Sequence, residues 1–163
     1  MAALHSSSNR PTIKTLVEAV MHNTGEDSLG KNLVPPHWEA LEPFLQSFTL
    51  APSQTLIAQG ATDRTLYFLE SGSLSVHFED LSGKVHLAIV QAGSIVGEGA
   101  FFSQMPRKAT VQAVGDCRLW TMTYIRFVEL SQKQPKVALA LAMALGAVIA
   151  RRMTHRRKRV SVT

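Results

Sequence analysis

The sequence has 163 residues, of which 45% are apolar and 18% are charged, which is the balance of a folded globular domain and not of a disordered chain. A chain of this length forms one domain of ordinary size. Its single cysteine, Cys117, excludes an intramolecular disulfide and a zinc site made of cysteine clusters. The first eight residues lack the apolar core of a secretory signal, so we expect a cytoplasmic protein.

The net charge of +5 comes from one end of the chain. Six of the 17 basic residues lie between Arg151 and Arg159, and the remaining 11 are balanced by 12 acidic residues. Such an end is typical of a solvated helix terminus, where basic side chains complement the helix dipole, and contact with nucleic acid or anionic lipid is the alternative. The net charge therefore says nothing about a binding pocket.

We expect two helices in the first third of the chain, after a poorly ordered polar leader over residues 1–12. Residues 37–47 place apolar side chains on one helical face, and Pro43 predicts a bend or a boundary there. Residues 13–47 are thus predicted to form a helical lead-in. The earlier of the two helices, over residues 12–23, has its apolar residues at helical spacing: Ile13, Leu16, Val17, Val20 and Met21.

The segment 48–122 consists of short runs with strand-like alternation, separated by turn residues. The alternation is clear at residues 74–78 and 85–89. Many short strands at this spacing indicate an antiparallel sandwich or roll, and not a parallel sheet. Turns are predicted around the glycines Gly60, Gly72, Gly83, Gly93 and Gly115.

Residues 123–157 predict two further helices, followed by a basic tail over residues 158–163. The second helix, over residues 136–157, contains fourteen consecutive apolar residues, 137–150. A transmembrane helix needs about 20, so we expect no transmembrane segment. A helix that is apolar on all sides is buried on more than one side, which favours a homodimer through this helix; the alternative is that it covers only its own domain. Small residues four apart form the expected contact ridge: Ala138, Ala142, Gly146 and Ala150.

The segment 97–111, with the sequence GEGAFFSQMPRKATV, carries the chemistry. Gly97 and Gly99 leave backbone N–H groups open to close approach, and such groups beside the guanidinium of Arg107 suit a phosphate. An ionised Glu98 only accepts hydrogen bonds, so it suits a ligand hydroxyl. One short segment therefore offers a phosphate site and a hydroxyl site.

This segment resembles the phosphate-binding cassette of the cyclic nucleotide-binding domain family, and the resemblance extends from about residue 41 to about 153. It implies an α+β fold: an antiparallel, jelly-roll-like β-roll with N-terminal helices and a C-terminal hinge and lid helix. It also implies that Glu98 binds the ribose hydroxyl and Arg107 the phosphate. The segments 55–60 and 66–76 match early strands and glycine turns of the same family.

The resemblance assigns roles to the remaining candidate residues. The contact to the base is expected from the last turns of the lid helix, around Arg151, Arg152 and His155. Backbone N–H groups around Gly99, Ala100, Lys108 and Ala109 complete the phosphate cradle, and apolar contacts to the purine come from Leu87, Ile89 and Val90.

Two positions depart from the family pattern. Gly99 stands where relatives usually carry leucine or isoleucine, and Lys108 replaces a small residue. A lysine side chain cannot accept a hydrogen bond from guanine, so we expect cAMP to be preferred, with cGMP as the alternative.

We therefore expect a sensory domain that binds a cyclic nucleotide, is not an enzyme, and needs no metal or other cofactor. The lone histidines His77 and His86 lack the spacing of a cupin metal site, and no serine or cysteine lies in a nucleophile turn. Only residues 158–163 follow the predicted long helix, so no sequence-specific DNA-binding module is expected in this chain. The alternative is a ligand-free β-roll that acts as a dimerising interaction module.

Overall fold

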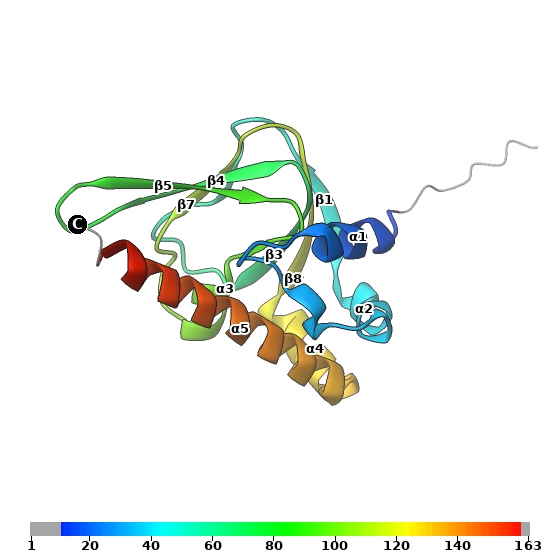
Figure 1. The fold of residues 1–163 in the computed structure, drawn as a ribbon. Helices are drawn as coiled ribbons and strands as arrows, with labels where there is room; N and C mark the ends of the chain where they lie inside the picture. The colour runs from blue at the N-terminus through cyan, green and yellow to red at the C-terminus, as the bar shows by residue number, and fades with distance from the viewer. Residues whose placement is uncertain (1–10, 161–163) are drawn as a thin grey trace, which may run out of the picture.

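The computed structural model describes the backbone of residues 11–160, and their side chains except those of residues 31 and 156–160. The predicted leader, residues 1–12, lies outside the described residues except for its last two. The side chains of the predicted basic tail, 158–163, also lie outside them. Figure 1 shows a β-roll with helices gathered along one side.

The N-terminal region forms α1 (Lys14–His22), the short 3-10 helix η1 (Gly30–Asn32), α2 (Pro35–Leu41) and η2 (Glu42–Phe44). The second helix was expected to continue to residue 47, but it ends earlier. Gln46 and Ser47 pair with Thr121 and Trp120 of the sheet, so they are strand residues. Pro43 explains the change, because it has no N–H to continue a helix and the strand pairing satisfies the residues that follow.

Within residues 11–160, eight strands form two antiparallel four-stranded sheets. The order in the first is β1-β8-β3-β6 and in the second β2-β7-β4-β5, which leaves β5 at an edge. This arrangement confirms the predicted α+β fold with an antiparallel β-roll. The strands are β1 (Gln46–Leu50), β2 (Thr55–Ile57), β3 (Thr65–Ser71), β4 (Ser73–Glu79), β5 (Val85–Gln91), β6 (Ile95–Val96), β7 (Thr110–Ala113) and β8 (Cys117–Thr123).

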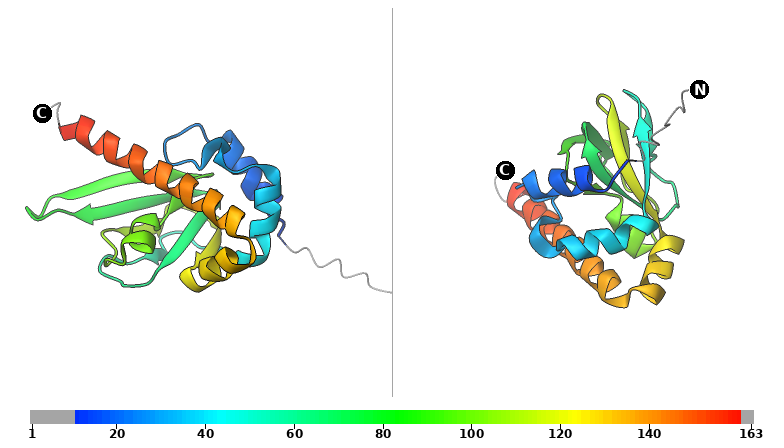
Figure 2. Two further views of the ribbon diagram at one scale, coloured as in Figure 1. Left: turned by 90° about the horizontal axis from the view of Figure 1, so that it is seen from below. Right: turned by 90° about the vertical axis from the view of Figure 1, so that its right-hand side faces the viewer.

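Three helices complete the described chain: α3 (Glu98–Ser103), α4 (Tyr124–Lys133) and α5 (Pro135–Val160). Thr123 caps α4, since its hydroxyl accepts a hydrogen bond from the Arg126 N–H at 3.3 Å. Pro135 begins α5, a position where the missing N–H costs no helical hydrogen bond. The two views in Figure 2 show α5 as one long helix across the roll, with α1 and α2 on the same side.

The apolar side chains form two cores. One fills the inside of the roll and includes Ile57, Leu69 and Val111. The other lies between the roll and the helices and includes Trp38, Phe68 and Leu141. The first half of α5 is therefore anchored by apolar burial.

The exposed face of α5 does not consist of the residues that were predicted to form the contact ridge. Ala138 is buried against its own domain and Ala142 is half-buried, so these two do not belong to an outward surface. The exposed face instead carries residues spaced alternately four and three apart, which is the spacing of a coiled-coil seam. These residues are Leu139, Met143, Gly146, Ala150 and Met153.

By length and composition alone, Pro135–His155 is long and apolar enough to cross a membrane, although the sequence predicted no such segment. A third of its most apolar window is buried inside the protein. Since the core helix of a globular protein passes the same test, the observation is weak support for a span.

Candidate functional site

Gly97 joins β6 to α3 and forms the centre of the cassette. Its φ of +92° lies in the left-handed region, and a Cβ there would lie 2.6 Å from the Thr65 carbonyl oxygen and 2.8 Å from Arg107 Nη1. Only glycine fits such a position without displacing the arginine. The backbone at Gly97 therefore allows the close approach of Arg107.

Arg107 is almost completely buried, with 4% of its surface exposed. Its Nε and Nη2 donate to the two carboxylate oxygens of Asp63 at 3.2 and 2.6 Å. Nη1 donates to the Gly97 carbonyl at 2.9 Å, and Nη2 also donates to the Thr65 carbonyl at 2.8 Å. These four bonds hold the guanidinium plane in one orientation, directly beside the start of α3.

Asp63 compensates the buried charge of Arg107. Hydrogen bonds from Arg107 hold the pKa of the Asp63 carboxyl below its ordinary value of 3.8, although partial burial acts in the opposite direction. The Asp63 side chain is 47% exposed, so it reaches the buried arginine from the solvent side.

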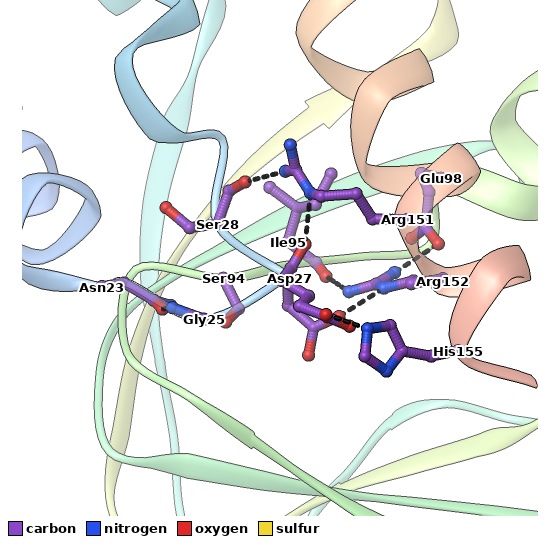
Figure 3. A network of polar contacts seen from close by, with 11 residues as sticks. Asn23, Gly25, Asp27, Ser28, Ser94, Ile95, Glu98, Arg151, Arg152 and His155 are labelled. Carbon is purple, nitrogen blue, oxygen red and sulfur yellow. Dashed lines mark hydrogen bonds and ion pairs between the residues drawn. The ribbon is translucent and has the colours of Figure 1, made fainter. Parts of the chain in front are cut away.

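Glu98 is the first residue of α3 and is buried, with 9% exposed. Its Oε1 accepts a hydrogen bond from Nη1 of Arg152, near the end of α5. Arg152 also donates from Nε to Asp27 at 2.6 Å and from Nη2 to the Ile95 carbonyl at 2.7 Å. Figure 3 shows Arg152 between Asp27 and Glu98. The structure thus joins two predicted site residues 54 positions apart.

The electrostatics of Arg152 follow from these two carboxylates. Burial alone lowers the pKa of a guanidinium, but the charges of Glu98 and Asp27 outweigh it and raise the pKa of Arg152 above its ordinary value. Arg152 therefore remains a cation beside Glu98 of the cassette.

The other cassette residues lie around these two arginines. Gly99 and Ala100 are in the first turn of α3, whose first N–H groups have no acceptor within the helix. An ideal Cβ on Gly99 would meet no atom within 4 Å, so open space replaces the side chain expected there. Lys108 is exposed and Ala109 is half-buried, both in the extended segment before β7.

The three residues predicted to contact a purine do not lie on one surface. Leu87 and Ile89 are exposed, at 62% and 49%, whereas Val90 is buried in the roll core. Successive strand residues point to opposite faces, so the pair and Val90 face opposite sides of β5. One planar base cannot meet all three from one side, and the alternation in the sequence already carried this signal.

Sequence reasoning missed three residues that support the site: Asp27, Asp63 and Arg64. Arg64 donates from Nε and Nη2 to the Phe101 carbonyl of α3, at 3.0 and 2.8 Å. Its guanidinium carbon also lies 3.5 Å from the ring centroid of Tyr124, at the start of α4. Arg64 therefore links the cassette helix to the C-terminal helices by a cation–π contact.

The histidines considered for metal binding make other contacts. Within residues 11–160, no group of three or more histidine, cysteine or acidic side chains could hold a metal ion. His86 pairs with Asp80 at 2.8 Å, and His77 Nε2 lies 2.8 Å from the Ser75 hydroxyl.

Fold and site together define a β-roll domain in which one short segment carries a buried acid, Glu98, and a buried arginine, Arg107. The family model of the cyclic nucleotide-binding domain matches residues 48–134, and the chain belongs to this family of regulatory binding domains. The cAMP-activated global transcriptional regulator CRP of Escherichia coli O6:H1 is 32% identical over 127 residues, which cover 77% of this chain and 59% of CRP. The chain thus spans less than two thirds of that relative.

Solved structures agree on the fold. A cyclic nucleotide-binding domain from Methylobacillus flagellatus superposes with a TM-score of 0.78 at 18% identity, covering 91% of this chain and 82% of the other. The regulatory domain of Toxoplasma gondii PKA, crystallised with cAMP, gives a TM-score of 0.56 at 25% identity and covers 71% and 41%.

Proposed function

We propose that this chain binds a cyclic mononucleotide reversibly, prefers cAMP to cGMP, and acts as a cytoplasmic regulatory domain without enzymatic activity. The observation that carries this proposal is the contact between the buried Arg107 and the Gly97 carbonyl. It brings the guanidinium to the start of the segment that also carries the buried Glu98. A cation for a phosphate and an acceptor for a hydroxyl thus occupy one small site.

The proposed contacts follow from the donors and acceptors present. The phosphate interacts with Arg107 and with the N–H groups of Gly99, Ala100, Lys108 and Ala109. The ribose hydroxyl donates to Glu98. Lys108 is exposed and cannot accept a hydrogen bond from the guanine edge, which supports the preference for adenine.

Two features of α5 extend the proposal. Its end lies over the cassette through Arg152, so we infer that it serves as the lid over the base and that binding changes its position. Its outer face exposes the seam that begins at Leu139 and ends at Met153, which supports a homodimer in which two copies of α5 pack together.

A second function is favoured by one observation. Asp63 already pairs with Arg107, and Arg152 already pairs with Glu98, so the two charged side chains assigned to the ligand, Arg107 and Glu98, are paired without one. A ligand-free β-roll that acts only as a dimerising interaction module would look the same.

Isothermal titration calorimetry of the purified chain separates the two functions. We expect cAMP to bind with one site per chain and 5′-AMP, which lacks the cyclic phosphate, to bind much more weakly. In competition, cGMP should displace cAMP no better than cAMP itself. Absence of heat with cAMP at millimolar concentration would reject nucleotide binding, and a tenfold advantage of cGMP would reject the base preference.

A further inference from the structure

The end of α5 is held by an N-terminal segment, residues 26–28, which connects α1 to η1. Arg151 donates to the carbonyls of Glu26 and Ser28 at 3.1 and 2.5 Å. Arg152 donates to the Asp27 carboxylate at 2.6 Å, and His155 pairs with the Glu26 carboxylate. Three side chains from two successive turns of α5 therefore bind three consecutive residues (Figure 3).

The same segment is fixed on its other side to the strand that leads into the cassette. The Asp27 carbonyl accepts a hydrogen bond from the Ile95 N–H at 3.4 Å, and Ser28 forms a β-bridge with Ser94. Just before it, Asn23 Nδ2 donates to the Ala92 carbonyl at 3.0 Å and to the Ser94 hydroxyl at 2.9 Å. Residues 26–28 thus lie between α5 and the residues that precede Glu98, and cannot shift without disturbing one of them.

From these contacts we propose that residues 26–28 are a docking site for the end of α5, and that Asp27 is a positioning residue for the nucleotide site. Asp27 holds Arg152 against Glu98, so that a fraction of the ligand-free molecules already has the end of α5 closed over the cassette, and ligand binding raises that fraction. The inference rests on the proposed function, because it assigns a role to Asp27 in nucleotide affinity.

The loss of Asp27 is expected to lower the affinity for cAMP, because Asp27 and Glu98 bind the same guanidinium, that of Arg152. One guanidinium binds Glu98 through Nη1 and Asp27 through Nε, so each carboxylate restrains the other contact. When a ribose hydroxyl competes for Glu98, Asp27 keeps Arg152 in place. Apparent affinity is the intrinsic affinity multiplied by the fraction of molecules in the competent state, so an interaction that populates the closed state tightens binding.

The first experiment measures hydrogen exchange in the ligand-free protein. Asp27→Asn should increase the exchange rate of the turns of α5 that carry the docked side chains, residues 148–155, while the strands of the roll exchange as before. Glu39→Gln, which removes an exposed carboxylate on α2, is the matched control and should change neither. Unchanged exchange at residues 148–155 would overturn the docking site, whether or not the protein binds a nucleotide.

The second experiment measures cAMP affinity in a double-mutant cycle. Asp27→Asn should weaken binding roughly threefold to tenfold, and Asp27→Glu should restore part of it. In Arg152→Gln, adding Asp27→Asn should cost little more, because the two residues act through one contact. Tighter binding by Asp27→Asn, or fully additive losses, would overturn the positioning role, whereas failure of the unmutated protein to bind would overturn the proposed function.

Discussion

Two arginines hold the two halves of the site in different ways. Arg107 belongs to the roll, is 3% exposed in its side chain, and is bound by groups 10 to 44 residues away in the chain. Arg152 belongs to α5, is 26% exposed, and is bound by groups 54 to 125 residues away. Arg107 is held by residues at or near the ends of β3 and β6, two strands that pair with each other. Arg152 is held where three separate segments meet.

This difference separates anchoring from response. Arg107 cannot leave its place without breaking contacts that the roll itself needs, so it suits a permanent phosphate anchor. Arg152 can leave with the end of α5 while the apolar first half of that helix, including Leu141 and Leu145, stays in the core. Variants in the two regions should therefore have different effects.

The largest effect is expected from Arg107→Ala. Removing one member of a buried, hydrogen-bonded charge pair costs roughly 2–5 kcal/mol in binding, which corresponds to a loss of cAMP affinity of more than tenfold. Calorimetry measures it, with Arg126→Ala, an exposed arginine of α4, as the control. If Arg107→Ala bound cAMP as well as the unmutated chain, the anchor would lie elsewhere.

A substitution on the exposed face of α5 should abolish dimerisation without changing the contacts of Arg107. Gly146 is exposed and a Cβ there meets no atom within 4 Å, so Gly146→Glu fits its own domain but places a charge in the seam. We expect a folded monomer by light scattering, while Gln132→Glu on α4 should remain a dimer. Since each buried Å² contributes about 25 cal/mol, loss of the seam should abolish association at micromolar concentration. A monomeric unmutated chain would show that α5 serves only its own domain.

A truncation that removes the C-terminal part of α5 compares its contribution to cAMP affinity with that of Arg107. Deleting residues 151–163 removes Arg151, Arg152 and His155 but none of the roll. We expect cAMP affinity to fall by less than in Arg107→Ala, and thermal unfolding to remain cooperative. An equal or larger loss in the truncated chain would make α5 the main anchor.

The smallest expected effect is a change in folding stability at low pH. The pKa of Asp63 is lowered in the folded protein, so its contribution to stability is present above pH 3.8 and is lost as the pH falls through the folded value. Asp63→Asn should therefore be less stable than the unmutated chain at pH 7, and the difference should shrink below pH 3.8. Urea unfolding at pH 7 and pH 3 measures this; a difference independent of pH would mean that the ion pair does not stabilise the fold.

Sequence reasoning succeeded where the relevant residues are close in the chain. The cassette places Gly97, Glu98 and Arg107 within one short segment, and strand alternation with glycine turns predicted the roll. These local patterns predicted the family and the β-roll fold, and the family model and the sheet topology confirm both predictions. Their physical basis is local as well: a glycine with positive φ, and side chains with a period of two.

The remaining features depend on tertiary contacts. Nothing local marks Asp27, because its partner Arg152 is 125 residues away. Likewise, Ala138 and Gly146 look equivalent in the sequence, yet packing against the roll buries one and exposes the other. The predicted end of the second helix, residue 47, was wrong because pairing with β8 makes Gln46 and Ser47 strand residues.

Amide hydrogen exchange of the full chain with and without saturating cAMP tests the separation of anchor and response most directly. We predict that cAMP protects the cassette, residues 97–111, and also changes exchange at residues 148–155 of α5. In Arg107→Ala both changes should disappear, whereas in the chain lacking residues 151–163 cassette protection should persist. Protection confined to the cassette in the unmutated protein, with identical exchange throughout α5, would contradict the account.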